Sequence, residues 1–390
     1  MKLSTIANSV APSLTRRLFN LAKNYPDVID FTLGDPDVQP NDAIKKAACT
    51  AINNGKTRYS QNAGLLELRQ AICKKYKSRE GLKYDPNSEC IVTVGAMEGL
   101  FLALLALLDN GDEVVIPAPY YVNYVQMVQL CRGVPVITGE ESDNKLEIDI
   151  EKIKRAITPK TKAIILNSPA NPSGKVVSQE KIKKIAELAI ENDLVVISDE
   201  VYKCLIYDNC SFKSIVSYEG MRERTILVNS FSKEFCMTGY RIGYVLAPHE
   251  IIDAMVKLQE NICACAPLPS QYAAIEAFSS KTDYSENMKK IFSLRRNQLV
   301  YGINKISGLS CITPEATFYL MVDISKTNMN SIDFAERLLE SVHVAVVPGI
   351  AYGKNCDGYV RIAFTLEAEK IEEGLKRINS FMVAFLENKK

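Results

Sequence analysis

The chain has no tryptophan and only two histidines among its 390 residues, so it has little capacity for histidine chemistry. His249 and His343 lie far apart in the sequence and outside the spacing of metal ligands. This argues against a zinc site and against a Ser-His-Asp triad. If the protein transfers protons, we expect it to use lysine.

The eleven cysteines include no CxxC pair, the spacing typical of zinc and redox sites. Only Cys263 and Cys265 stand close together, as CxC. An odd, scattered set of cysteines is typical of free and mostly buried thiols in a reducing compartment. The sequence therefore favours a cytoplasmic protein.

Neither sign of charge is in excess, because 47 Lys and Arg residues nearly cancel 46 Asp and Glu residues. No basic run with interleaved aromatics is present, so nucleic acid and anionic membranes are not expected partners. The longest apolar run, at 99–108, is too short to span a bilayer, and the first twenty residues contain no apolar region of a signal peptide. A small molecule is the expected ligand of a soluble protein.

Short β-rich runs alternate with amphipathic segments between about residues 90 and 250, which is the pattern of an α/β domain. The predicted strands are 91–94, 113–116, 163–166, 194–198 and 225–228. Segment 181–193 would form a helix that covers the sheet with one apolar face, made of Ile182, Ile185, Ala186, Leu188 and Ala189. The strands are expected to form a largely parallel sheet.

The pattern changes after about residue 285, where a charged helix at 286–305 is predicted. A strand at 318–324, a helix at 333–340 and strand-like runs at 343–349 and 359–364 follow. These elements predict a smaller α+β domain, and the N-terminal arm is expected to pack with it. The predicted boundaries are 41–285 for the large domain and 1–40 with 286–390 for the small domain.

Chemically suggestive residues follow the carboxyl ends of four predicted strands. They are Gly95-Ala96-Met97, Asn171-Pro172, Asp199 and Lys233. In doubly wound sheets, ligands bind at this edge, so residues distant in the sequence would line one crevice. This predicted convergence is stronger evidence for a site than any single motif.

Lys233 stands after Ser230 and Ser232, and Arg241 follows eight residues later. A lysine amine forms a Schiff base with an aldehyde, while hydroxyl and guanidinium donors bind a phosphate, so the motif has what pyridoxal 5′-phosphate (PLP) requires. Arg241 and a dry cleft would lower the pKa of Lys233. A lone lysine would more often be a solvated loop residue, but this context favours the functional interpretation.

Asp199, Tyr202 and Asn171 each have a structural and a functional interpretation. Asp199 is either a helix N-cap or a strand-end charge facing water, or, if buried, it holds a proton on the pyridine nitrogen of PLP. Tyr202 either packs in the core or donates a hydrogen bond to the phenolate oxygen of PLP. Asn171 either forms part of a turn or contacts that phenolate and a substrate carboxylate. Gly174-Lys175 is not a P-loop, because the required upstream glycine and the following Ser or Thr are missing.

Three further positions are candidates for binding. The amides of Ala96 and Met97 would lie at a helix N-terminus, which stabilises a phosphate. Tyr121 would stack on the pyridine ring, although Tyr120 and Tyr124 could equally be packing residues. Arg361, on a predicted strand, is either exposed or a bidentate partner for an α-carboxylate.

Together these motifs resemble those of the fold-type-I PLP-dependent class I/II aminotransferases, over essentially the whole chain. The resemblance implies a large domain with a mostly parallel seven-stranded sheet between helices and a smaller α+β domain. It implies that Lys233 carries PLP as an aldimine, that Asp199 pairs with the pyridine nitrogen, and that Tyr202 and Asn171 contact the phenolate. The phosphate would be bound by Ser230, Ser232, Arg241 and the amides of Ala96 and Met97.

The same resemblance implies a substrate site and an assembly. Arg361 and the backbone of Gly34 would bind the α-carboxylate of the substrate. Tyr59 resembles the tyrosine that reaches the phosphate of the neighbouring subunit. We therefore expect a homodimer with sites at the subunit interface.

Some positions depart from the common pattern of the family. Tyr121 and Tyr240 stand where many relatives have tryptophan, and Ser173 replaces threonine. Met97 stands where some aspartate-preferring relatives have a lysine for the side-chain carboxylate, which argues against an aspartate donor. Segments 12–17 and 266–274 resemble the branch that contains aromatic-amino-acid and N-acetyl-diaminopimelate aminotransferases.

The resemblance implies an aminotransferase that moves the amino group of an L-amino acid to a 2-oxo acid. An aromatic or other non-acidic donor is favoured, with 2-oxoglutarate as the expected acceptor. A PLP-dependent carbon-sulfur β-lyase and an aspartate-type aminotransferase stay open as alternatives. A PLP-sensing regulator is disfavoured, because Lys233 is present and no helix-turn-helix segment is expected before Asp37.

Overall fold

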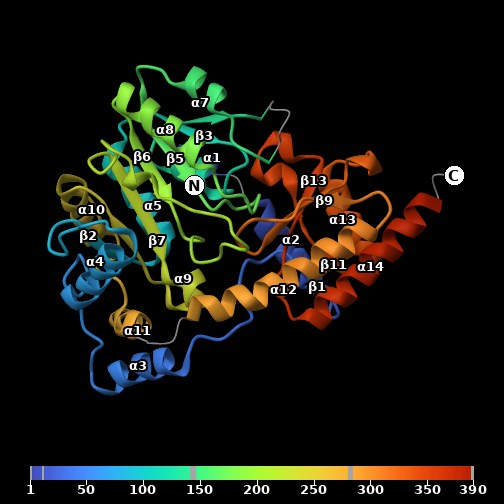
Figure 1. Cartoon of the computed structure of the whole chain (residues 1–390), viewed down its shortest axis with the longest axis horizontal. Helices are drawn as coiled ribbons and strands as arrows, with labels where there is room; N and C mark the ends of the chain where they lie inside the picture. The colour runs from blue at the N-terminus through green and yellow to red at the C-terminus, as the bar shows by residue number, and fades with distance from the viewer. Residues whose placement is uncertain (1, 11–12, 141–145, 280–283, 388–390) are drawn as a thin grey trace.

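A computed structural model describes residues 2–10, 13–140, 146–279 and 284–387, and its main feature is a seven-stranded sheet (Figure 1). The strand order is β2-β8-β7-β6-β5-β3-β4, and β8 is antiparallel to both of its neighbours. The strands are β2 (Cys90–Thr93), β3 (Glu113–Pro117), β4 (Val134–Thr138), β5 (Thr161–Asn167), β6 (Val195–Asp199), β7 (Thr225–Ser230) and β8 (Gly243–Leu246). The predicted mostly parallel seven-stranded sheet is confirmed.

Helices cover both faces of this sheet. One face packs against α5 (Gly95–Leu107), α6 (Asn123–Leu130) and α10 (His249–Ile262). The opposite face packs against α4 (Leu66–Glu80), α7 (Ile150–Ala156), α8 (Gln179–Glu191) and α11 (Leu268–Ser279), and α3 (Asp42–Asn53) lies on α11. Successive strand residues point to opposite faces, so Val114 and Val115 enter different cores. This two-sided burial explains the continuous apolar strand runs.

Helix α8 illustrates how the sequence sets an element. Ser178 caps its N-terminus by accepting a hydrogen bond from the amide of Lys181, so the helix begins two residues before the predicted start. The five apolar residues predicted to form one face are all buried. The helix ends at Glu191, and Asp193, two residues later, has a φ of 50°, in the left-handed region that is common just after a helix.

A second body combines the two ends of the chain. Its four-stranded antiparallel sheet has the order β12-β13-β10-β9, and a separate parallel pair joins β1 to β11. The strands are β1 (Ile29–Asp30), β9 (Ser310–Cys311), β10 (Tyr319–Asp323), β11 (Val344–Ala345), β12 (Val347–Pro348) and β13 (Tyr359–Ala363). The helices are α2 (Leu14–Ala22), α12 (Tyr284–Lys305), α13 (Ser331–Val342) and α14 (Ala368–Glu387). Leu18 and Ala22 of the N-terminal arm share a core with these helices.

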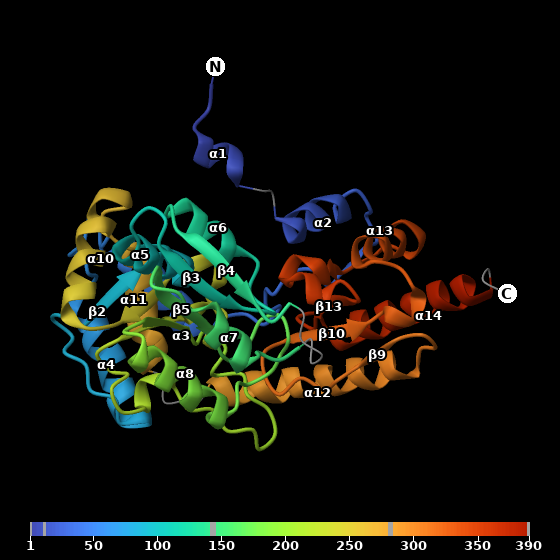
Figure 2. The same ribbon diagram turned by 90° about the horizontal axis from the view of Figure 1, so that it is seen from above.

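The long helix α12 runs from the end of the large sheet, beside α9 (Phe231–Glu234), to the second body (Figure 1). The predicted domain boundary at 285/286 falls inside this helix, and the boundaries stay a prediction. Helix α1 (Thr5–Ser9) projects from the rest of the structure (Figure 2). No helix in the described ranges is long and apolar enough to cross a membrane.

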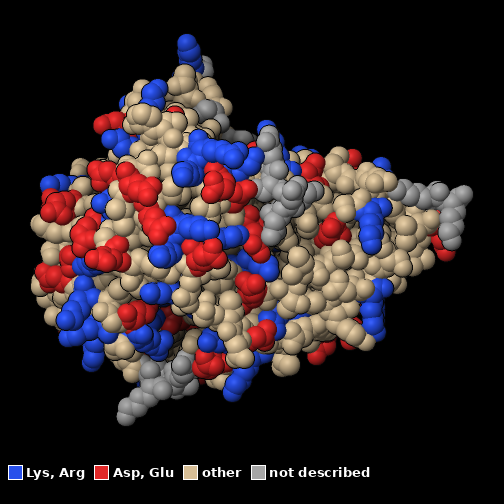
Figure 3. Space-filling view, turned by 45° about the horizontal axis from the view of Figure 1, so that its top comes forward, with Lys and Arg blue, Asp and Glu red and all other residues tan. Residues whose placement is uncertain are grey.

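The molecular surface agrees with the balanced composition. On the face seen in Figure 3, basic and acidic side chains are interspersed without a large area of one sign. The eleven cysteines are all free thiols, and Cys73, Cys90, Cys131, Cys236 and Cys356 are buried. Within the described ranges, no group of three or more His, Cys, Asp or Glu side chains is arranged to hold a metal ion.

Candidate active site

A cavity of about 400 Å³ lies at the carboxyl ends of β5, β6 and β7, and residues of both bodies line it. The residues predicted from the sequence that line it are Gly34, Ala96, Met97, Tyr121, Asn171, Asp199, Tyr202, Ser230, Ser232, Lys233, Arg241 and Arg361. The predicted convergence is therefore present. Tyr59 does not line the cavity, and it is 86% exposed.

Lys233 lies in α9, a single turn that directly follows β7. Ser230 caps this turn by accepting a hydrogen bond from the amide of Ser232. The Nζ atom of Lys233 donates to the carbonyl oxygen of Gly34 at 2.7 Å. The pKa of Lys233 is lowered to about 8, chiefly by burial; the charge of Asp35 opposes this shift, and the guanidinium of Arg241 contributes to it. A substantial neutral fraction of the amine is thus accessible near neutral pH.

Gly34 allows the close approach of a second chain segment. A Cβ atom at this position would lie 1.8 Å from the hydroxyl oxygen of Tyr319. That hydroxyl is 3.0 Å from the hydroxyl of Tyr202, so Gly34, Tyr319 and Tyr202 are packed together beside Lys233. A glycine is required here because no side chain fits.

Ser230, Ser232 and Arg241 form a corner rich in hydrogen-bond donors at the N-terminus of α5. The hydroxyl groups of Ser230 and Ser232 are 2.9 Å apart. Gly95, the first residue of α5, has a φ of +75°, and a Cβ atom there would lie 2.6 Å from Nη2 of Arg241. A guanidinium, two hydroxyls and a helix N-terminus are the chemical groups that bind a phosphate.

Asp199 is a buried carboxylate at the end of β6. Its Oδ2 atom accepts a hydrogen bond from the hydroxyl of Tyr124 at 2.7 Å, and its Oδ1 atom accepts from the amide of Val201 at 3.3 Å. No ion pair of Asp199 with a Lys, Arg or His side chain occurs in the part of the chain that the structure describes. Burial raises the pKa of Asp199 to about 6, against the two hydrogen bonds that lower it. The carboxylate is therefore suited to a cationic ligand atom.

The raised pKa of Asp199 predicts a pH effect on the ligand-free protein. Its folded pKa of about 6 lies above its ordinary value of 3.8, so the folded state binds more protons between these values. Stability should consequently fall as pH rises from about 4 to 6, by at most about 3 kcal/mol. Asp199→Asn should lose this part of the pH dependence, as measured by urea unfolding at pH 4 and pH 7. Equal pH slopes in both proteins would contradict the raised pKa.

Arg361 is only 3% exposed, so it does not occupy the exposed strand position that the sequence left open as an alternative. Its Nη1 atom donates to Oδ1 of Asn171 at 3.0 Å, and its Nη2 atom donates to the carbonyl oxygen of Thr32 at 2.6 Å. Its Nε atom is buried without a hydrogen-bond partner. A buried, unpaired donor on a guanidinium is costly, so this side chain is suited to an anionic ligand.

In the cavity wall near α5 and α6, an amide, a tyrosine hydroxyl and a methionine sulfur lie close together, which the sequence did not reveal. Asn123 donates through Nδ2 to the hydroxyl of Tyr121 at 3.1 Å, and both groups are 3.7 Å from the sulfur of Met97. Burial raises the pKa of Tyr121 to about 12, so its hydroxyl stays protonated. This part of the cavity is consequently uncharged.

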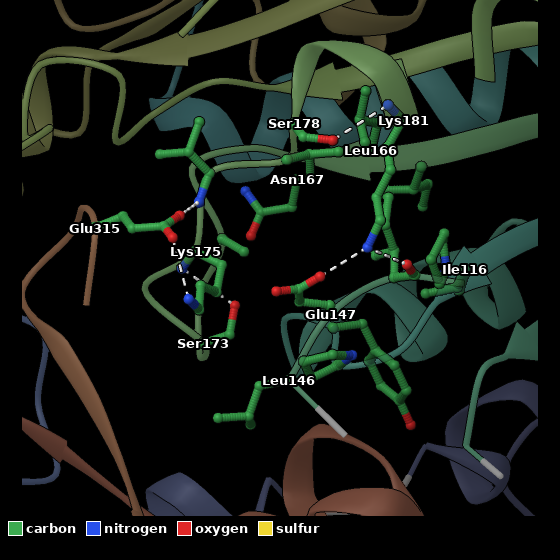
Figure 4. Close-up of a pocket in the computed structure, with 18 of the residues that line it drawn as sticks. Ile116, Leu146, Glu147, Leu166, Asn167, Ser173, Lys175, Ser178, Lys181 and Glu315 are labelled. Atoms are coloured by element: carbon green, nitrogen blue, oxygen red, sulfur yellow. Dashed lines mark hydrogen bonds and ion pairs between the residues drawn. The ribbon is translucent and has the colours of Figure 1, made fainter. Parts of the chain in front are cut away.

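A smaller cavity of about 150 Å³ lies next to the first and shares Tyr124 and Asn167 with it. Its charged side chains are already paired (Figure 4). Lys181 contacts Glu147 at 2.8 Å, and Lys175 contacts Glu315 at 3.1 Å. Since these charges compensate one another, the larger cavity is the better candidate for an active site.

Sequence reasoning missed Tyr124, Thr32, Tyr319 and Asn123 as members of the site. Tyr124 stood in the sequence as one of three neighbouring tyrosines, and nothing there distinguished a partner of Asp199 from a packing residue. Thr32 contributes only its backbone carbonyl, which carries no sequence signal. Tyr319 lies in a strand of the second body, and its place beside Tyr202 depends on how the two bodies pack.

Comparison with known proteins gives a consistent family match. The model of the family "Aminotransferase class I and II" matches residues 26–378. An aspartate aminotransferase of Pyrococcus abyssi is 41% identical over 98% of each chain, and aromatic-amino-acid aminotransferase 2 of Thermococcus litoralis is 37% identical over 98% of each chain. A solved aspartate aminotransferase from Thermus thermophilus superposes with a TM-score of 0.92 at 35% identity, covering 97% of this chain and 99% of that one.

Proposed function

Because the chain belongs to the class I and II aminotransferases, we propose that it binds PLP in the larger cavity and moves the amino group of an L-amino acid to a 2-oxo acid, with 2-oxoglutarate as acceptor. The family membership confirms the resemblance that the sequence motifs indicated, and it makes the protein a transferase. The cofactor, the substrates and the roles of individual residues are the parts that we propose.

The observation that carries the proposal is the buried carboxylate of Asp199, which faces the same cavity as the amine of Lys233. The pyridine nitrogen of PLP, when protonated, supplies the cation that Asp199 lacks among the described residues. Ser230, Ser232, Arg241 and the amides of Ala96 and Met97 would hold the phosphate. When bound, PLP supplies an aldehyde for the lysine and a ring that withdraws electrons from the substrate.

The residues of the chain then have distinct tasks. Asp199 would keep a proton on the pyridine nitrogen, and Tyr124 would orient the Asp199 carboxylate. Tyr202 and Asn171 would donate hydrogen bonds to the phenolate oxygen, while Tyr121 would pack on the ring. Lys233 would remove the proton from the substrate Cα and deliver it to the C4′ carbon of the cofactor, for which its lowered pKa of about 8 is favourable.

Arg361 and Gly34 would bind the substrate α-carboxylate, and the unpaired Nε atom of Arg361 offers the donor for it. Replacing Arg361 with Ala should weaken substrate binding by about 1.5 to 3 kcal/mol, the contribution of a charge-assisted hydrogen bond. The dissociation constant of the amino-acid donor would be measured. Arg377→Ala is the matched control, because Arg377 pairs with Glu373 away from the cavity. Equal affinities in the two variants would contradict this role.

The exposed position of Tyr59 supports a homodimer as part of the proposal. The family resemblance implies that this tyrosine contacts the phosphate of the neighbouring subunit, and the residue is 86% exposed in the single chain. A partner subunit would cover it. We infer that two chains complete each other's cofactor sites. We also propose that the protein is cytoplasmic.

The donor is proposed to be aromatic or otherwise non-acidic, since the wall at Met97, Tyr121 and Asn123 is uncharged. An aspartate-type enzyme is the second candidate, because several relatives bear that name. A carbon-sulfur β-lyase would use the same residues up to the removal of the Cα proton.

Incubation of the PLP-loaded protein with ¹⁵N-labelled amino acids and 2-oxoglutarate tests the proposal. Transamination predicts labelled glutamate without free ammonia. A β-lyase would release ammonia and pyruvate without any acceptor, and this result would refute the proposed function.

A further inference from the structure

Arg16 lines the larger cavity, yet the proposed function gives it no task. It lies in α2, which Leu18 and Ala22 anchor in the core of the second body. Its neighbour Arg17 forms an ion pair with Glu336 at 2.7 Å and does not line the cavity. The two adjacent arginines thus have different surroundings, and only Arg16 faces the site.

The charges that line the cavity are unequal in sign. Four cationic side chains, Arg16, Lys233, Arg241 and Arg361, face it with one carboxylate, Asp199. Lys233, Arg241 and Arg361 are each assigned to the cofactor or to the α-carboxylate. Within the described ranges Arg16 has no ion pair, and its guanidinium lies 5.3 Å from the ring of Phe19 in the same helix. One positive charge is therefore left for a ligand.

Thr15 of the same helix also lines the cavity, and its buried hydroxyl lies beside the hydroxyl of Tyr352. The wall formed by α2 therefore offers a guanidinium and a hydroxyl together, which suits a carboxylate.

Helix α2 is also adjacent to the proposed α-carboxylate site. It packs against β12, and Val347 of β12 is paired with Arg361 of β13. Two guanidinium groups from neighbouring elements therefore line one cavity. A substrate held by Arg361 at its α-carboxylate could form an ion pair with Arg16 only through a second anion on its side chain.

We propose that Arg16 is a specificity-determining residue that binds the distal carboxylate of dicarboxylic substrates, with Thr15 as an additional donor. This inference rests on the proposed function and names the substrate class of the acceptor. Acidic substrates are then not excluded by methionine instead of lysine at position 97, because Arg16 of α2 supplies the positive charge. Since Arg16 is an exposed, flexible side chain, it can also move aside for an apolar donor.

The test uses the PLP-loaded protein and glutarate, a dicarboxylate that has no amino or oxo group to react. Calorimetric titration should show that Arg16→Ala weakens glutarate binding about 10- to 100-fold, the loss of one charge-assisted contact. Butyrate, which lacks the second carboxylate, should bind both proteins alike. Arg17→Ala removes the same charge from the same helix and should leave glutarate binding unchanged.

Kinetics provide a second measurement. Arg16→Ala should raise the KM for 2-oxoglutarate, whereas the KM for 2-oxoglutaramate, which keeps the α-carboxylate but has a neutral side-chain amide, should not change. Arg16→Lys, which keeps the charge, should recover part of the loss, and melting temperatures check that each variant is folded. Equal glutarate affinity in the Arg16→Ala and Arg17→Ala proteins would overturn the inference. Because glutarate is not turned over, this result is independent of whether the protein transaminates.

Discussion

Replacing Lys233 with alanine is expected to reduce turnover by about 10⁴-fold or more, the largest loss predicted for any residue of the chain. Its amine is the only one assigned to both the link with the cofactor and the movement of the Cα proton, and general acid-base catalysis alone contributes up to about 10⁴-fold. The pKa of about 8 depends on the burial of this amine, so a lysine elsewhere would not replace it. Product formation would be followed with L-glutamate and with aromatic donors.

The variant should still retain PLP without a covalent bond, because Ser230, Ser232, Arg241 and Asp199 are unchanged. Equilibrium dialysis would measure this retention and separate a loss of chemistry from a loss of cofactor. Lys257→Ala is a suitable control, since Lys257 is a surface residue paired with Asp253. A Lys233→Ala protein with full activity would refute the assignment.

Asp199→Asn is expected to lower kcat/KM by about 10²- to 10⁴-fold. Removing one partner of a buried charge pair costs about 3 to 5 kcal/mol, and each 1.36 kcal/mol corresponds to a tenfold change in rate. The asparagine is close in shape to aspartate and can keep the hydrogen bond from the amide of Val201. Steady-state kinetics of both proteins at saturating PLP would measure the loss.

The same substitution should act in the opposite direction on stability. Because burial raises the pKa of Asp199 to about 6, the charged carboxylate destabilises the ligand-free protein above that pH. Asp199→Asn should therefore be more stable than the wild type at pH 7 in the absence of PLP, while being far less active in its presence. A variant that lost activity and stability together would instead indicate a structural role for Asp199.

The parts of the fold that were predictable follow from burial on both faces of a parallel sheet. Strands such as β5 and β6 contain continuous apolar runs, and helix α8 has a regular apolar face behind a serine cap. Strands β4 and β8 were not predicted. The edge strand β4 begins at an exposed Val134 followed by a proline, and β8 is four residues long and begins with a glycine.

The site was predictable where its residues follow strand ends, because the topology brings those ends to one edge. Lys233, Asp199 and Asn171 all face the cavity for this reason. The partners supplied by tertiary packing were not predictable. Tyr124 reaches Asp199 from α6, and Arg16 reaches the cavity from the second body, so neither has a local sequence signal.

The proposed function requires that the protein takes the amino group from one substrate and holds it until a second substrate collects it. The most direct test mixes the PLP-loaded protein with an excess of L-amino acid in the absence of any 2-oxo acid acceptor. Transamination predicts one equivalent of 2-oxo acid per active site, no free ammonia, and renewed product formation only when 2-oxoglutarate is added. Continuous release of 2-oxo acid and ammonia without an acceptor would contradict it.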